Sequence, residues 1–203
     1  QMLLAAGMIQ KAETIESGKT VCDYTPEEIE RKISIYAKLT HLRWKEKLIN
    51  VWDTPGSSDF TGEVITAFRA SELAVLMING KAGIQIETIK LWRNLDRRNK
   101  ARLAFINNMD EERADYQRCV QDIHSRFEVE VCPVTMPMGS GSGFSGVIDV
   151  LRETAWIMNG GAEKQAPIPD EYADAVARAR EVLAGAAAEG DEHGRQDAGQ
   201  RLA

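Results

Sequence analysis

The stretch Leu48-Ile49-Asn50-Val51-Trp52-Asp53-Thr54-Pro55-Gly56 decides the fold, because a nearly all-apolar run ends there in an acidic turn. Two similar apolar runs follow at residues 73–78 and 103–106, and helical stretches at 62–71 and 85–98 separate the runs. Strands that are apolar on both faces and alternate with helices are typical of a parallel sheet covered on both sides. The sequence therefore predicts an α/β fold with a doubly wound, mainly parallel sheet, in which ligands bind beyond the carboxyl ends of the strands.

Ahead of this stretch the chain changes from an irregular segment to a strand. Residues 9–30 are polar and lack a sustained period, except that residues 25–28 carry the capping chemistry of a short helical turn. So long an irregular segment is typical of a functional or mobile part of a protein. Residues 33–40 then alternate between apolar and polar, which predicts a half-buried strand that a turn at 45–46 pairs antiparallel with 48–52.

The sequence after the core predicts a smaller lobe and a tail. Two extended segments at 129–136 and 144–157 are joined by a glycine-serine loop, and a helical pattern follows them. We therefore expect a small β-β-α lobe over residues 129–188. From 189 to 203 the chain is rich in Gly, Gln, Asp and Arg, which predicts a disordered tail.

The composition is that of an ordinary soluble domain. The 203 residues carry 25 Lys and Arg against 31 Asp and Glu, a formal net charge of −6, with 43% hydrophobic residues. This balance argues against DNA as a partner, and no apolar run approaches the ~20 residues of a membrane helix. The three cysteines form no C-x-x-C pair and the three histidines are scattered, so neither a disulfide framework nor a zinc site is predicted. We expect a cytoplasmic chain with neither a membrane nor a DNA partner.

Two acidic motifs stand where predicted strands end. After the first, the Asp53 carboxylate can hold a water on a metal ion, and the N–H of Gly56 can face a phosphate. In Asn107-Asn108-Met109-Asp110, the Asp110 carboxylate can accept two hydrogen bonds from a guanine edge that adenine does not offer. Each charge-assisted bond of this kind is worth about 1.5–3 kcal/mol. Taken singly, the motifs are also typical of a Pro-Gly turn and of an Asx turn that caps the next helix.

Taken together and in this order, the motifs make the chain resemble the GTP-binding domain of translational GTPases, and in particular the elongation factor G family, over residues 1–188. The similar segments are 53–61, 73–85, 107–110, 144–149 and 167–172. The resemblance implies a P-loop NTPase-like G-domain with an incomplete GTP-binding core over residues 1–128. Switch I then falls at about 10–35 and switch II at about 53–61, and residues 129–188 are the lobe that this family inserts within its GTPase domain.

The resemblance also implies a site for Mg²⁺ with GTP or GDP. Ser34 stands where the family has a Thr that binds Mg²⁺, and Asp53 would hold the same ion through water. Gly56 would sense the γ-phosphate. Ser57 stands where the family has a His that positions the attacking water, so Ser57 is the doubtful catalytic candidate.

For the guanine base, the resemblance implies Asn107, Asn108 and Asp110, with Asn108 in place of a Lys. The family's phosphate-binding loop is missing from the sequence. Gly18-Lys19-Thr20 imitates the end of such a loop, but Glu13 stands where the motif needs Gly and no strand precedes it. We therefore expect weakened nucleotide binding.

The resemblance implies that the chain is an internal piece of a GTP hydrolase that acts on the ribosome during protein synthesis and contacts the ribosome, including its stalk protein. Hydrolysis by this chain is expected to be impaired, because the phosphate loop is missing and the His is replaced. Two alternatives remain open. One is a noncatalytic ribosome-interaction module derived from a GTPase, and the other is a relative that protects the ribosome against tetracycline.

Overall fold

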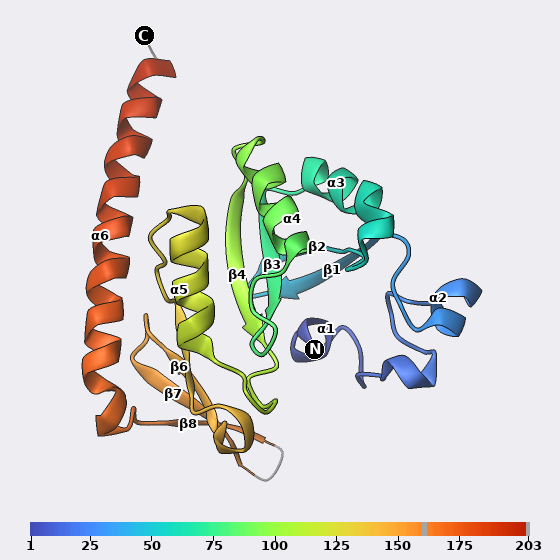
Figure 1. Cartoon of the computed structure of the whole chain (residues 1–203), viewed down its shortest axis with the longest axis horizontal. Helices are drawn as coiled ribbons and strands as arrows, with labels where there is room; N and C mark the ends of the chain where they lie inside the picture. The colour runs from blue at the N-terminus through green and yellow to red at the C-terminus, as the bar shows by residue number, and fades with distance from the viewer. Residues whose placement is uncertain (160–161, 202–203) are drawn as a thin grey trace. The chain divides into compact units, whose positions relative to one another are not determined.

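The structure is a computed structural model that describes residues 1–159 and 162–201, with side chains for 1–158 and 163–189 (Figure 1). The fold is mixed α/β with a parallel pair of strands, and the fold class predicted from the sequence is confirmed. Within the described residues, no helix combines the length and the apolar character that a membrane span requires.

The chain divides into two units, and the strands β3 and β4 run from one into the other. The first unit comprises Gln1–Leu76 and Ile89–Leu103, and the second unit comprises Met77–Thr88 and Ala104–Ala203. The helices that lie wholly or mostly in the first unit are α1 (Met2–Ala5), the 3-10 helix η1 (Ile15–Ser17), α2 (Pro26–Arg31), the 3-10 helix η2 (Ser58–Phe60), α3 (Thr61–Ala70) and α4 (Ile86–Asp96).

The predicted hairpin of the first unit is confirmed. β1 (Lys38–Trp44) and β2 (Lys47–Asp53) pair antiparallel, and Lys45 and Glu46 between them have φ values of 45° and 64°. Two successive left-handed residues are the geometry of a tight hairpin turn. The predicted start of the first strand is wrong, however, since β1 begins at Lys38 rather than at residue 33. The reason is that the amides of residues 35–37 bond to carboxylate side chains instead of to a strand.

The core of the first unit is formed by one face of each longer helix. In α3 the buried residues are Val64, Ala67 and Phe68, and in α4 they are Trp92 and Leu95. Spacings of three and four residues place side chains on one helix face, which explains why the predicted helical stretches bury a single stripe.

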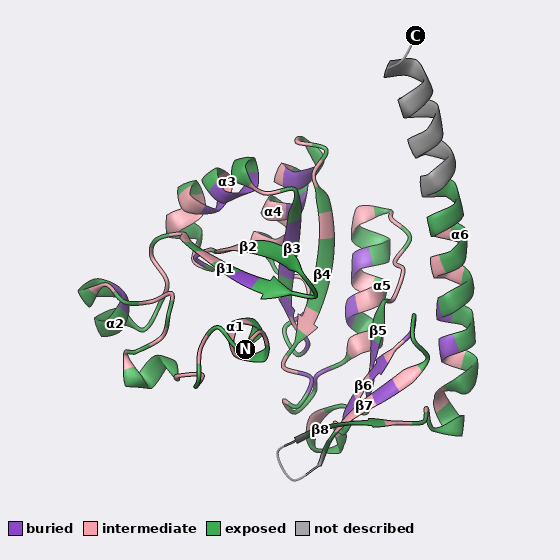
Figure 2. Cartoon of the chain, turned by 180° about the vertical axis from the view of Figure 1, so that it is seen from behind, coloured by how far each residue is buried: buried purple, intermediate pink, exposed green. Residues whose placement is uncertain are grey.

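The parallel sheet departs from the prediction in how its strands are covered. β3 (Leu73–Asn79) pairs with β4 (Ala101–Asn107), while β2 pairs only with β1 among the described strands. β3 also alternates, because Ala74, Leu76 and Ile78 are buried whereas Leu73, Val75 and Met77 are 45–60% exposed (Figure 2). The expectation of strands covered on both faces is therefore wrong for β3, since successive side chains of a strand point to opposite faces and only one face is covered.

The lobe of the second unit has more strands than predicted. It follows α5 (Tyr116–Phe127), and its antiparallel sheet has the order β5 (Thr135–Met138), β6 (Gly146–Asp149), β7 (Thr154–Asn159) and β8 (Ala162–Ala166). The predicted β-β-α lobe is corrected to four strands and a helix. The long segment 144–157 splits because Asp149 Oδ1 accepts a hydrogen bond from Arg152 N at 2.9 Å and Glu153 takes a φ of 52°, which together form a turn.

The helix α6 (Asp170–Arg201) completes the lobe. Val176 and Ala179 of α6 are buried in one cluster with Met138, Ile148 and Ala155 of the sheet. α6 continues to Arg201, where the sequence predicts a disordered tail from residue 189. The run Ala186–Ala188 near the predicted boundary has high helix propensity, so the helix propagates past it. Side chains from residue 190 onward and the backbone of 202–203 lie outside the described residues.

Candidate functional site

The loop after β2 carries three of the predicted site residues. Asp53 is the exposed last residue of β2, and Gly56 is exposed in the following loop. A Cβ at Gly56 would meet no atom within 4 Å, so the fold by itself does not require glycine there. Ser57 caps η2, since its Oγ accepts a hydrogen bond from Asp59 N at 3.4 Å. The loop thus offers an exposed carboxylate and an unobstructed backbone N–H, whereas the Ser57 hydroxyl serves a structural bond.

Asp53 also contacts Cys22, which the sequence did not single out. Burial and the neighbouring Asp53 carboxylate raise the pKa of the Cys22 thiol to about 12, so the thiol stays protonated and hydrogen-bonds to that carboxylate. The contact brings the irregular segment before α2 to the end of β2. Nothing local in the sequence predicts it, because the two residues are far apart in the chain.

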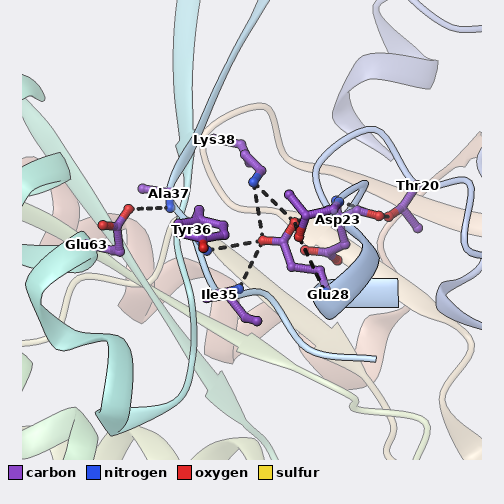
Figure 3. Close-up of polar contacts among 9 residues, drawn as sticks. Thr20, Asp23, Glu28, Ile35, Tyr36, Ala37, Lys38 and Glu63 are labelled. Atoms are coloured by element: carbon purple, nitrogen blue, oxygen red, sulfur yellow. Dashed lines mark hydrogen bonds and ion pairs between the residues drawn. The ribbon is translucent and has the colours of Figure 1, made fainter. Parts of the chain in front are cut away.

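Glu28 is the most deeply buried charged residue of the described core, with 0% exposure. It closes the capping box of α2: Oε2 accepts from Thr25 N at 3.2 Å and from Thr25 Oγ1 at 2.9 Å. Oε1 accepts from Ile35 N and from Tyr36 N, each at 3.1 Å (Figure 3). Burial alone raises the pKa of Glu28, but these bonds and one from Lys38 outweigh it and hold the pKa at about 2.

Lys38 neutralises the buried Glu28 carboxylate. Its Nζ lies 3.2 Å from Glu28 Oε2, and the Lys38 side chain is only 11% exposed. The same ammonium lies 4.5 Å from the ring centroid of Tyr24 and 4.8 Å from that of Tyr36. A charge pair with such neighbours is tolerated away from water, because hydrogen bonds and ring faces replace the lost hydration.

Ser34 directly precedes this clamped stretch. It is half-buried, and within the described part of the chain its hydroxyl makes no hydrogen bond. Three residues later, Ala37 N donates to Glu63 Oε2 of α3 at 2.8 Å (Figure 3). The segment that holds Ser34 is therefore tied both to α2 and to the helix that follows the Asp53–Gly56 loop.

In the second unit, the turn after β4 carries the predicted base-binding residues. Asn107 ends β4, and its carbonyl accepts from Gly80 N at 2.8 Å. Asn108 has a φ of 59°, a left-handed conformation that Asn adopts more readily than most residues. Met109 is buried, while Asp110 is exposed and bonds to no other described residue. The buried methionine anchors the turn and leaves both Asp110 oxygens available to a ligand.

Gly80, which directly follows β3 and donates its N–H to Asn107 O in this turn, is a residue that the sequence did not single out. A Cβ there would lie 2.9 Å from Met109 Sδ and 3.1 Å from the carbonyl oxygen of Asn107. A Cβ at this position would therefore displace the Met109 side chain and crowd the Asn107 carbonyl, so glycine suits the close approach of β3 to the turn after β4. Asn79, just before it, accepts from Lys81 N and Ala82 N at 2.9 Å each, which shapes the loop that follows.

A cavity of about 690 Å³ in the second unit does not include the predicted base-binding residues. It is lined by Met109, Tyr116, Tyr172 and Arg113 among others, but neither Asn107 nor Asp110 lines it. The expected roles of Asn107 and Asp110 therefore rest on the exposed turn itself.

The segment Gly18-Lys19-Thr20 has the structure of a turn and not of a phosphate-binding loop. Gly18 ends the 3-10 helix η1 in a left-handed conformation with a φ of 62°. Thr20 Oγ1 is engaged with the backbone N and O of Asp23, both at 3.2 Å. Among the described elements, the strand that a phosphate loop requires before it does not precede the segment.

Ser34, Asp53, Gly56 and Ser57 thus belong to the first unit, and Asn107, Asn108 and Asp110 to the second unit. Among the described residues, no three His, Cys, Asp or Glu side chains gather as a complete metal site. Asp53 and Ser34 nonetheless present the oxygen ligands that Mg²⁺ prefers, and Mg²⁺ commonly completes its shell with water and phosphate oxygens. The residues present are therefore compatible with a metal that arrives with a nucleotide.

Comparison with known proteins defines the class to which this fold and these motifs belong. Residues 1–192 match the family described as the elongation factor Tu GTP binding domain. The chain is 27% identical to a Thermus thermophilus protein of known crystal structure, with a TM-score of 0.81 over 88% of this chain and 27% of that chain. The chain therefore belongs to this family, the GTP-binding domain of translational GTPases.

Two relatives make the similarity specific. Elongation factor G of Mycoplasma pneumoniae is 34% identical over 186 residues, which are 90% of this chain and 27% of that protein. The elongation factor G-like protein of Thermotoga maritima is 34% identical over 174 residues, 86% of this chain and 25% of that protein. The family resemblance drawn from the sequence is confirmed, and the chain spans about a quarter of the length of these relatives.

Proposed function

We propose that the chain binds guanine nucleotide together with Mg²⁺. The observation that carries the proposal is the turn after β4, where a buried Met109 anchors an exposed Asp110 with both oxygens unengaged by described residues. Asp110 accepts the two guanine N–H groups, and Asn107 and Asn108 support the base. Two charge-assisted bonds at about 1.5–3 kcal/mol each are sufficient to select guanine over adenine.

The phosphate and metal ligands in this proposal are the residues that the family resemblance assigns at Ser34 and in the loop after β2. Asp53 would hold Mg²⁺ through water, Ser34 would offer its free hydroxyl oxygen to the ion, and the N–H of Gly56 would face the γ-phosphate. When bound, Mg²⁺ neutralises the charge of the phosphates. Ser57, which would stand where the family has the His that positions the attacking water, offers no charge, and its hydroxyl already caps η2.

By analogy with the full-length relatives, we propose GTP hydrolysis on the ribosome during protein synthesis. The proposed partners are the ribosome and its stalk protein, and the proposed location is the cytoplasm. The Ser57 cap favours slow hydrolysis by this chain. A noncatalytic ribosome-interaction module is the second candidate, and the same bond supports it.

Equilibrium binding of a fluorescent GDP tests the proposal. The 203-residue chain is titrated in Mg²⁺ and in EDTA, with ADP and GDP as competitors. We expect GDP to compete and ADP to fail, and we expect Asp110→Ala to reduce this discrimination about a hundredfold or more, because two bonds are lost. Glu112→Ala, an exposed carboxylate two residues away, is the matched control. Equal competition by ADP and GDP, or no binding in either buffer, rejects the proposal.

A further inference from the structure

The backbone just before β1 is held by side chains where a strand would use a neighbouring strand. Three consecutive amides, those of Ile35, Tyr36 and Ala37, each donate to a carboxylate oxygen (Figure 3). The first two donate to Glu28 Oε1 of α2, and the third donates to Glu63 Oε2 of α3. Two helices that are separated in sequence by the β1–β2 hairpin therefore hold one stretch of backbone.

We propose that Glu28 and Glu63 are positioning residues that couple the segment containing Ser34 to the loop containing Gly56. This inference rests on the proposed function, in which Ser34 and Gly56 contact the metal and the γ-phosphate. Ser34 lies immediately before the clamped amides. Glu63 lies in the first turn of α3, which begins directly after η2 and the Gly56 loop.

The two carboxylates differ in how firmly they hold the backbone segment, so one of the two connections opens before the other. Glu28 is fully buried, accepts from four backbone or side-chain donors of Thr25, Ile35 and Tyr36, and is paired with Lys38. Glu63 is only half-buried, and the bond from Ala37 is the contact that joins it to the segment. Glu28 is thus the permanent anchor, and the Ala37–Glu63 bond is the connection that opens first.

One bond of this kind is enough to matter for a binding site. A charge-assisted hydrogen bond to a carboxylate changes an opening equilibrium by about ten- to a hundredfold. When the bond is closed, a ligand that orders the segment at Ser34 also orders the start of α3 and the loop before it. When the bond is open, the two segments respond independently.

Amide hydrogen exchange in the nucleotide-free 203-residue chain tests the geometry, followed by NMR or by mass spectrometry of peptides that cover residues 35–37 and 54–60. We expect Glu63→Ala to accelerate exchange of the Ala37 amide and of residues 56–60 by about tenfold or more. Glu63→Gln keeps an acceptor oxygen, and we expect it to restore most of the protection. Glu72→Ala, an exposed carboxylate just past α3, is the matched control and leaves exchange unchanged. Exchange within twofold of the unaltered chain in Glu63→Ala overturns the proposal.

Metal-dependent binding separates the failure of this inference from the failure of the proposed function. The ratio of the dissociation constants of a non-hydrolysable GTP analogue in EDTA and in Mg²⁺ measures the contribution of the metal when the γ-phosphate is present. We expect Glu63→Ala to lower this ratio by about tenfold, with recovery in Glu63→Gln. If the unaltered chain binds no nucleotide, the proposed function fails and the exchange experiment alone decides the clamp. If the unaltered chain binds nucleotide and Glu63→Ala has the same ratio of dissociation constants as the unaltered chain, the proposed coupling between Glu63 and the site is rejected while the proposed function stands.

Discussion

Replacing Glu28 with Gln tests how far a buried carboxylate stabilises the first unit. The variant keeps the shape of the side chain and one acceptor oxygen but removes the negative charge. The backbone N–H groups of Thr25, Ile35 and Tyr36 then face a weaker acceptor, and Lys38 loses its counter-ion. The contribution of the charge follows from the pKa of Glu28, which the fold lowers from 4.5 to about 2.

The magnitude and the pH window follow from that pKa. A carboxylate with a lowered pKa stabilises the folded state above its unfolded pKa, and this stability is lost as the pH falls through 4.5 toward 2. The full difference corresponds to about 3 kcal/mol at pH 7. About 2 kcal/mol of this is lost between pH 7 and pH 3. We therefore expect Glu28→Gln to be less stable than the unaltered chain by about 3 kcal/mol at pH 7, and by only about 1 kcal/mol at pH 3.

Urea denaturation followed by tryptophan fluorescence measures this difference. In a Trp156→Phe background the remaining tryptophans, Trp44, Trp52 and Trp92, all belong to the first unit, so the signal reports on the unit that contains Glu28. Glu27→Gln, at an exposed position of the same helix, is the control and changes the free energy of unfolding little at any pH. A free-energy gap between Glu28→Gln and the unaltered chain that stays constant from pH 7 to pH 3 would refute the reasoning.

Three further changes test the local geometry. Gly139→Ala places a Cβ 2.2 Å from Gly143 O at a φ of 77°. We therefore expect this variant to lower the free energy of unfolding of the second unit in urea by about 3 kcal/mol. In the control Gly143→Ala the new Cβ has no atom within 4 Å, and we expect it to lower the free energy of unfolding by less than about 1 kcal/mol. Gly80→Ala forces the turn after β4 apart, and we expect a loss of about 1–3 kcal/mol together with weaker GDP binding in the titration above. Asp53→Asn removes the carboxylate that raises the pKa of Cys22, so we expect iodoacetamide to label Cys22 faster at pH 9, as mapped by mass spectrometry; an unchanged labelling rate would contradict the contact.

Local patterns predicted the parts of this protein that depend on neighbouring residues. The hairpin was predictable because alternation and the Lys45–Glu46 turn specify strand pairing over a few residues. The helices α3 and α4 were predictable because their apolar residues recur at spacings of three and four residues. The positions of Asp53 and Asp110 at strand ends followed from the apolar runs before them.

Other features were not predictable, because they depend on residues that are distant in the chain. The start of β1 was placed too early, since alternation cannot show that Glu28 and Glu63 take the amides a strand would use. The number of strands in the lobe was too small, because a turn within 144–157 depends on the Asp149 side chain. The roles of the site residues in binding nucleotide stay predictions that the titrations described above decide.

The sequence by itself determined the class of this protein, since motifs at strand ends and their order along the chain are written in the primary structure. Only the tertiary structure decided that Glu28 is a buried anchor, that the Cys22 thiol contacts the Asp53 carboxylate and that a side chain at Gly80 would crowd the turn after β4. The physical reason is that hydrogen bonding and steric exclusion depend on distances of about 3 Å between atoms, and folding brings those atoms together from positions that no local pattern relates.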